Sequence, residues 1–491
     1  MASTNPYFSQ YHTQRFSFIG SPQQRDGTTL KDQRFLNLYP EMITSPISDG
    51  KKYYLKKRPG TTLQRTWPGF SGNGQGIYYW PATGHYYTAF GGHLFLDGTL
   101  LITLTTAIGR VGFTEYNNST PGGNFLIVCD GNAGWIIGTT GGVSQITDGN
   151  FPSPHIPNPI ALDGYVFLAA AGTQTIHNCA LTDPHTWPSD GFIDAEMYPD
   201  IIQGLTKNNN YLVAVGTESV EFFYDNANAT GSPLQRNAPA VAQFGTPAPF
   251  SIQQTEKEIT LIGQTGTGGR TVWLIEGFQP TEIADAPVRE ALDAEGVNIN
   301  VATGMVVQCA GHKWYIMNLL HNSRTFVYDY DEKMWHEWSF SLNAQVFNYM
   351  AVADSGDGHP VCLSFDNANT VELDPNSYTD YDPNNPGTPL LINCQVTTVK
   401  IDFDTIKRKR MFRLSLTADA PAADPVPMLV TWSDDDYQSF VNPIVLPLDS
   451  DYPTITQLGY FRRRAFRFIY QQPWPLRMES FEVDIIQEVR R

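Results

Sequence analysis

The sequence predicts an all-β protein whose main body is a β-propeller. Strand-like runs recur in groups spaced about 40 to 50 residues apart, a period typical of propeller blades. Aromatic residues make up 13% of the chain, and 41 Gly and 34 Pro interrupt it. This composition is typical of many short strands joined by tight turns. With 41% hydrophobic and only 16% charged residues, the chain is too apolar to be disordered.

The repetitive region begins near residue 75, and each group holds three or four strand-like runs. The first group comprises GIYYW (76–80), HYYTAF (85–90), HLFL (93–96) and LLITL (100–104), joined by PATG, GG and DGT turns. Later groups begin near residues 125, 165, 211, 259, 313 and 346. We count six or seven groups and expect six blades, with one group shared or interrupted. A two-sheet sandwich with long insertions is the structural alternative.

The repeats lie between two other regions, which gives three expected domains. Residues 1–70 are expected to form an extended N-terminal leader packing on the body, with short strands at 34–41 and 53–60. Residues 71–380 form the propeller. After a Pro- and Gly-containing linker, residues 381–491 form a C-terminal β-sandwich-like module with longer strands. Helix is scarce, and the one fair candidate lies at residues 285–295.

The charge distribution constrains what the chain can bind. Its net charge is −17, and the first 390 residues carry the whole excess (19 − 36 = −17), whereas residues 391–491 hold 13 basic and 13 acidic side chains. An acidic body does not wrap nucleic acid stably, because wrapping requires clustered Lys and Arg. It does suit a surface past which DNA slides without sticking.

Cysteine usage and hydropathy indicate a protein made in a reducing cytosol. The five cysteines are widely separated and form no CxxC pair, so we expect them to be small buried hydrophobes. No signal peptide is recognisable at the N-terminus. No apolar run approaches the length of about 18 residues that indicates a membrane helix.

No motif supports catalysis, and we assign no catalytic, cofactor-binding or metal-binding residue. The run GQTGTGGRT (263–271) lacks the Lys of a phosphate-binding loop and precedes a strand, so we expect a hairpin turn. The run TWSDDDY (431–437) is similar to Asp-containing turns of sialidase propellers, and its three Asp are expected to be solvated. His177, His185 and His312 lie near predicted turns and form no HxH or HxxxH pair. The protein is therefore expected not to be an enzyme.

Two basic clusters in the terminal module are candidate subunit-interface residues. They comprise Lys407, Arg408, Lys409, Arg410, Arg462, Arg463, Arg464 and Arg467. Such charges can protect a solvated strand edge against aggregation. They can also contact the acidic body of a neighbouring subunit, or contact DNA directly. The sequence leaves these three readings open.

The chain as a whole resembles the packaged-DNA stabilisation, or tail nozzle, proteins of short-tailed bacteriophages. The resemblance rests on a succession of motifs: RFLNLYPE (34–41), RPGT (58–61), YLVAVGTESVEFFY (211–224), FGT (244–246), IG (262–263), TWSDD (431–435) and YFRRR (460–464). One departure is that Asp436 and Tyr437 stand where the family often has two Gly.

The resemblance implies a homohexameric ring below the portal and its adaptor ring, located in the virion tail and assembled in the host cytoplasm. It implies a central channel that retains packaged double-stranded DNA and ejects it without sequence-specific binding. It also implies contacts to a head-to-tail adaptor protein and to a tail fibre or spike protein. No cofactor and no membrane segment are expected.

The alternative is a carbohydrate-binding or glycan-processing β-propeller protein. A glycan-processing enzyme should bring Arg, Tyr and carboxylate side chains together in the central pocket of the propeller. A lectin should bind glycans as an isolated protein, whereas a nozzle protein should form rings.

Overall fold

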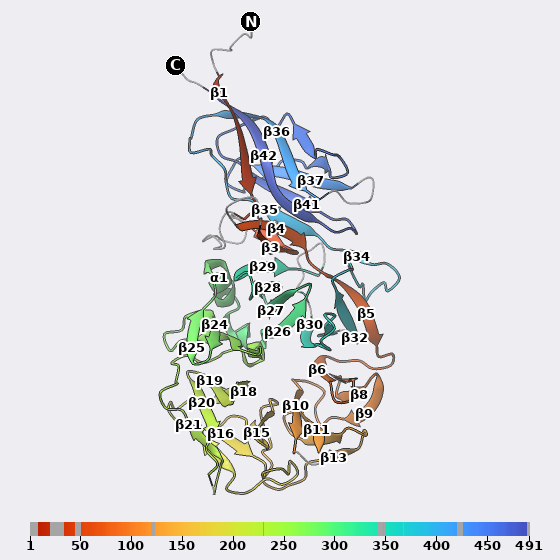
Figure 1. Cartoon of the computed structure of the whole chain (residues 1–491), viewed down its shortest axis with the longest axis vertical. Coiled ribbons are helices and arrows are strands. Elements are labelled where there is room, and N and C mark those ends of the chain that lie inside the picture. The colour runs from red at the N-terminus through yellow and green to blue at the C-terminus, as the bar shows by residue number, and fades with distance from the viewer. Residues whose placement is uncertain are drawn as a thin grey trace.

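The computed structural model describes residues 8–19, 34–44, 51–118, 123–228, 230–340, 347, 349–366, 368–419 and 426–488. Within these ranges the elements are strands, apart from the helix α1 (Ala286–Ala294) and two short 3₁₀ helices, η1 (Pro249–Ser251) and η2 (Gly296–Val301). Figure 1 shows a ring of small sheets with a second body stacked on one side of it. The all-β prediction is confirmed.

Six four-stranded antiparallel sheets belong to the ring alone, and five of these are continuous in sequence. These five are β6 (Gly74–Trp80), β7 (His85–Phe90), β8 (His93–Leu96) and β9 (Thr99–Thr103); β10 (Gly112–Asn117), β11 (Asn124–Cys129), β12 (Gly134–Gly138) and β13 (Val143–Gln145); β14 (Ile160–Leu162), β15 (Tyr165–Ala169), β16 (Thr175–Asn178) and β17 (Phe192–Asp194); β18 (Ile202–Asn208), β19 (Tyr211–Gly216), β20 (Val220–Asp225) and β21 (Leu234–Arg236); and β22 (Gln253–Gln254), β23 (Glu258–Gln264), β24 (Arg270–Glu276) and β25 (Gln279–Glu282).

The sixth sheet closes the ring with a strand from the N-terminal segment. It contains β30 (Tyr349–Ala353), β31 (Val361–Ser364) and β32 (Asn369–Asp374), and β5 (Gly60–Thr66) pairs antiparallel with β32 as its fourth strand. A strand of the N-terminal segment thereby pairs with the last strand of the propeller. Because β5 precedes residue 70, the sheet boundary does not coincide with the expected division between leader and propeller.

A further group of four strands is shared between the ring and the second body. This group, β26 (Thr303–Cys309), β27 (His312–Leu319), β28 (Arg324–Asp329) and β29 (Met334–Trp338), is one part of a nine-stranded sheet. The first strands contact one another in sequence order from β6 through β30, and β30 contacts β6. Seven four-stranded groups therefore surround the axis. Six are independent blades, and one is shared, as the sequence indicated.

Tight hairpins set the strand spacing in the blades. Asp97 and Gly98, which join β8 to β9, have φ angles of 45° and 89°. Asp163 and Gly164, which join β14 to β15, have φ angles of 47° and 86°. Two successive positive φ angles define the type I′ turn, whose twist matches that of the flanking strands. Buried side chains of adjacent blades, such as Trp80 and Leu126, pack in common cores.

The second body is a β-sandwich, as predicted for the C-terminal region. One layer contains β1 (Phe8–Ser17), β3 (Leu38–Thr44), β4 (Lys51–Lys57), β36 (Lys409–Ala418), β39 (Thr454–Thr456), β40 (Tyr460–Phe461) and β42 (Arg477–Glu488). The other contains β2 (Arg34–Leu36), β35 (Cys394–Thr397), β37 (Pro427–Ser433), β38 (Ile444–Pro447) and β41 (Ala465–Tyr470), which continue the nine-stranded sheet. A two-stranded sheet, β33 (Thr379–Asp380) and β34 (Leu390–Leu391), lies in the linker. Leader and C-terminal strands thus build one core, with Phe18 packed on Phe468 and Phe481.

The two bodies are joined at the outer strand of the shared group. Leu36 of β2 pairs in parallel with Glu337 of β29. The Glu337 carboxylate also binds Arg34 at 2.9 Å and Arg324 at 2.7 Å. Backbone pairing and a bridging carboxylate therefore connect the two bodies at this junction.

The predicted helix, the predicted hairpin and the predicted burial of the cysteines are confirmed. The candidate helix at 285–295 is α1, and Asp285 caps it by accepting a hydrogen bond from Val288 N. The Gly-rich run at 263–271 spans the hairpin between β23 and β24. All five cysteines are buried and free. Among the described residues, no helix is long and apolar enough to cross a membrane.

Candidate contact surfaces and an axial cavity

The two predicted basic clusters lie side by side in the sandwich. Lys409 pairs with Phe461 and Arg410 with Tyr460, because β36 and β40 are neighbouring antiparallel strands. Residues about 50 positions apart in sequence therefore form one corner of the molecule. The structure brings the clusters together, but it does not leave all eight side chains at the surface.

Lys409 is buried and does not belong to the candidate interface. Its Nζ donates hydrogen bonds to the carbonyl oxygens of Thr405 at 2.6 Å, Arg462 at 2.7 Å and Lys407 at 2.9 Å. Burial lowers the pKa of this ammonium group. Lys409 holds the loops on either side of it in place, which is a structural role within the chain.

Arg464 is also buried and is used within the chain. Its guanidinium binds Asp434 through two hydrogen bonds of 2.7 Å and donates to the carbonyl oxygen of Leu458. Asp434 is therefore not merely solvated, contrary to the sequence expectation. Asp436 binds Arg463 and Lys400 at 2.8 and 3.1 Å. Hydrogen bonds from Ser439 and Ser433 lower the pKa of Asp435 to about 2.

Of the eight predicted residues, four are exposed and have no acidic partner in the described chain: Lys407, Arg408, Arg410 and Arg462. Arg408 lies 4.4 Å from the ring centroid of Tyr460, and Arg410 lies 4.8 Å from that of Phe412. These cation–π contacts order the guanidinium groups without neutralising them. We call these four residues the basic corner. Arg467, half-buried, instead covers the ring of Phe440 at 3.7 Å.

One face of the propeller carries exposed carboxylates. Since strands alternate in direction, turns between first and second strands and between third and fourth strands lie on the same face. Asp163, Asp354 and Asp357 occupy turns of the first kind, and Asp190 precedes the fourth strand β17. All four are exposed, and none forms an ion pair in the described chain. We call this surface the acidic face. The same face also carries two exposed lysines, Lys257 and Lys333. Exposed carboxylates occur on the opposite face too, at Glu218, Glu290 and Asp293.

Among the described residues, one cluster of metal-ligand type occurs, and it lies on the acidic face of the propeller. His312, Asp329 and Asp331 offer ligand atoms within 4.8 Å of one another. However, the Asp329 carboxylate already accepts hydrogen bonds from His312 Nδ1, Trp314 Nε1 and the amides of Asp331 and Glu332, at 2.7 to 3.1 Å. The arrangement holds the β28–β29 turn, and His312 is a buried partner of Asp329, not a loose turn residue.

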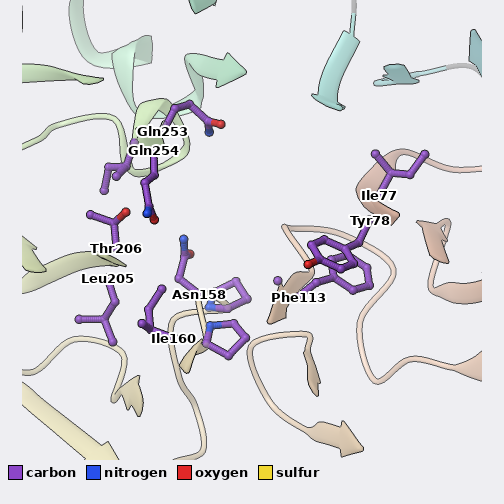
Figure 2. A pocket seen from close by; sticks show the side chains of 13 residues that line it. Ile77, Tyr78, Phe113, Asn158, Ile160, Leu205, Thr206, Gln253 and Gln254 are labelled. Carbon is purple, nitrogen blue, oxygen red and sulfur yellow. The ribbon is translucent and has the colours of Figure 1, made fainter. Parts of the chain in front are cut away.

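A cavity of about 300 Å³ lies at the propeller axis. It is lined by Ile77, Tyr78, Gly112, Phe113, Pro157, Asn158, Pro159, Ile160, Leu205, Thr206, Ile252, Gln253 and Gln254. Figure 2 shows Ile77, Tyr78 and Phe113 on one side and Leu205, Thr206, Gln253 and Gln254 on the other. The lining contains apolar and amide side chains, Thr206 and one tyrosine, Tyr78, whose hydroxyl donates to Glu115 at 2.7 Å. It differs from the Arg, Tyr and carboxylate set expected of a glycan-processing propeller.

The fold and these surfaces define a β-propeller protein fused to a sandwich and bearing two complementary charged surfaces. The family model described as "Bacteriophage P22 Gp10, beta-propeller" matches residues 18–376. The chain belongs to this family of phage stabilisation proteins, in agreement with the resemblance found in the sequence. A comparison with curated proteins finds no match.

Solved structures with similar folds are other propellers. One is the extracellular domain of a one-component system from B. thetaiotaomicron, with 9% identity and a TM-score of 0.45, which covers 79% of this chain. This chain spans 47% of the length of that one. Another is a virginiamycin B lyase from Staphylococcus aureus, with 10% identity, a TM-score of 0.38 and coverage of 74% of this chain and 99% of the lyase. The Neurospora crassa Pan2 WD40 domain has 11% identity, a TM-score of 0.39 and coverage of 65% and 96%.

Proposed function

We propose that the protein is a structural component of a short phage tail, forming a nozzle-like ring below the portal and adaptor. Membership of the phage stabilisation family supports a virion role. The observation that carries the proposal is the separation of unpaired charge between the basic corner of the sandwich and the acidic face of the propeller. A chain with complementary surfaces on its two bodies is suited to contact a copy of itself.

In the proposed ring, the basic corner of one subunit contacts the acidic face of the next. Among the described residues, the four basic residues of the corner and the four Asp residues of the acidic face have no ion-pair partner. Complementary charge steers association and fixes register more than it adds affinity. The contact would account for the restriction of the acidic excess to the first 390 residues, with balanced charge thereafter.

The acidic propeller also suits the proposed handling of DNA. A negatively charged surface repels the phosphates of double-stranded DNA, so DNA can pass it without sticking. On this proposal, a constriction in the ring retains the DNA before ejection. We propose that an adaptor protein above and a tail fibre or spike protein on the outside complete the assembly. On this proposal the protein acts in the virion tail after assembly in the host cytoplasm, and it is not an enzyme.

The proposal is tested by negative-stain electron microscopy of the purified chain, alone and with its adaptor complex. Rings with a central hole are the expected result, and adding 500 mM NaCl should reduce their number because salt screens the charged contact. Monomers that persist with the adaptor complex present would overturn the proposal.

The axial cavity supports a second candidate function, in which the propeller binds a glycan. Its amide side chains and its tyrosine are groups that can hydrogen-bond to a sugar. A glycan array probed with the whole chain separates the two functions. Saturable binding of one glycan class by a monomeric protein would favour this second candidate.

A further inference from the structure

Three successive blades of the propeller are almost free of Lys and Arg. Between Arg65 and Lys207 the sequence contains a single Lys or Arg, which is Arg110, and ten acidic residues. The stretch carries a net charge of −9 (1 − 10) out of −17 for the whole chain. It comprises the blades β6–β9, β10–β13 and β14–β17. More than half of the acidic excess is therefore concentrated in these three blades.

The blade β14–β17 also exposes two large apolar side chains beside its carboxylates. The Leu181 side chain lies beside Gly164, and Asp163 is the other residue of that β14–β15 turn. The Phe192 amide donates to the carbonyl oxygen of Asp190 at 2.9 Å. Leu181 is 56% exposed and Phe192 is 45% exposed. We call Asp163, Leu181, Asp190 and Phe192 the acidic patch, which is one part of the acidic face.

The basic corner has the same make-up with the opposite charge. Ile406 is 78% exposed, and its carbonyl oxygen accepts a hydrogen bond from Arg462 Nη1 at 2.8 Å. Tyr460 is 44% exposed, and the guanidinium groups of Arg408 and Arg410 lie 4.4 and 5.7 Å from its ring centroid. Arg and Tyr are enriched at protein interfaces and among the residues that dominate binding energy. Each surface therefore pairs exposed apolar side chains with charge of one sign.

The basic corner and the acidic patch lie at opposite ends of the molecule. Arg410 pairs with Ile486 near the end of β42, and that end pairs with the start of β1. Figure 1 shows β1 at the top of the longest axis and β15 and β16 at the bottom. The two surfaces are therefore too far apart to meet within one chain. Two copies can bring them together only end to end.

We propose that the basic corner of one copy binds the acidic patch of the next copy, with Ile406 and Tyr460 packed against Leu181 and Phe192. The inference rests on the proposed ring and specifies which part of the acidic face forms its contact. Complementary charge sets the orientation of the two copies. Such a contact joins two different surfaces, so it closes into a ring when the rotation between copies closes and otherwise extends as a filament.

Cross-linking with a short bismaleimide tests the contact in the full-length chain. The five native cysteines are buried, so they leave the background low. Covalent dimers are expected in an equimolar mixture of Ile406→Cys and Leu181→Cys. Neither variant should form dimers alone, because the contact joins position 406 of one copy to position 181 of another. The control mixture pairs Ile406→Cys with Val297→Cys, which lies on η2 and is 86% exposed.

The outcomes separate this contact from the proposed ring. No dimer in the first mixture, or as much dimer in the control mixture, would overturn the contact. If electron microscopy of the same sample shows rings, the ring stands and only the contact is wrong. Monomers without cross-linked dimer would overturn both.

Reversing the charge of the acidic patch gives a second measurement. Asp163→Asn with Asp190→Lys should weaken assembly roughly tenfold or more by mass photometry, because like charges then face each other. Glu290→Lys with Asp293→Asn makes the same change of charge on the opposite face and should leave assembly unchanged. Equal assembly of these two double variants would also overturn the contact.

Discussion

Arg58 and Asp380 form a bidentate ion pair with side chains only 0% and 1% exposed, the Nη1–Oδ1 and Nη2–Oδ2 distances being 2.9 and 2.5 Å. Arg58 also donates to Asn37 Oδ1 and to the carbonyl oxygen of Ser339. The pair thus joins the leader, the end of the shared group of strands and the linker before the C-terminal strands. It lies where the two bodies meet.

Breaking this pair should destabilise the protein strongly. Arg58→Met leaves Asp380 buried without its counter-ion, and we expect a loss of about 3–5 kcal/mol in the free energy of unfolding. The double variant Arg58→Met/Asp380→Leu should recover much of that loss. Denaturant unfolding measures both, with Arg463→Met as the control because its pair with Asp436 is exposed. A loss below about 1 kcal/mol, as for a surface pair, would contradict the expectation.

The turn after β37 should prefer glycine to alanine. Asp436 and Tyr437 have φ angles of 62° and 67°. Alanine is strained at positive φ and glycine is not, so Asp436→Ala should be about 1 kcal/mol less stable than Asp436→Gly. Both variants lose the same carboxylate. The same two substitutions at exposed Asp451, which lacks a positive φ, should not show this preference.

His336 should make stability depend on pH. It is 3% exposed, and neither ring nitrogen has a hydrogen-bond partner. Burial lowers the pKa of His336 to about 3. Its ordinary pKa is about 6.5, so the unfolded state gains a proton first as the pH falls. Stability is therefore lost progressively from about pH 6.5 down to about pH 3.

The effect of His336 is tested by measuring how the free energy of unfolding changes between pH 7 and pH 5. The unmodified chain should lose about 2 kcal/mol more than His336→Leu over this interval, from about 1.4 kcal/mol per pH unit. Identical pH profiles for His336→Leu and the unmodified chain would refute a buried neutral histidine.

The basic corner should govern assembly and not folding. Arg408→Glu combined with Arg410→Glu reverses two exposed charges that have no acidic partner in the described chain. We expect roughly tenfold or greater weakening of ring formation by mass photometry, because like charges then face the acidic surface. The melting temperature should change little. Arg289→Glu on the propeller is the matched control, and equal assembly of the two variants would exclude this contact.

Much of the fold was determined by the sequence itself, because it depends on neighbouring residues. Turn dipeptides such as Asp97-Gly98 and Asp163-Gly164 locate hairpins through their positive φ angles. The Asp285 cap locates the one α-helix of the described chain. The chain-long succession of motifs was sufficient to indicate the family, which the match over residues 18–376 confirms.

Only the tertiary structure decided which distant segments meet. β5 pairs with β32 some 300 residues later, and β2 lies between β29 and β35, so leader strands complete both bodies. No local pattern encodes such pairing, since a strand with a free edge can pair with many others. For the same reason, the burial of Lys409 and Arg464 could not be predicted from the sequence. Whether a basic side chain is an exposed contact or an internal support depends on the residues that fold against it.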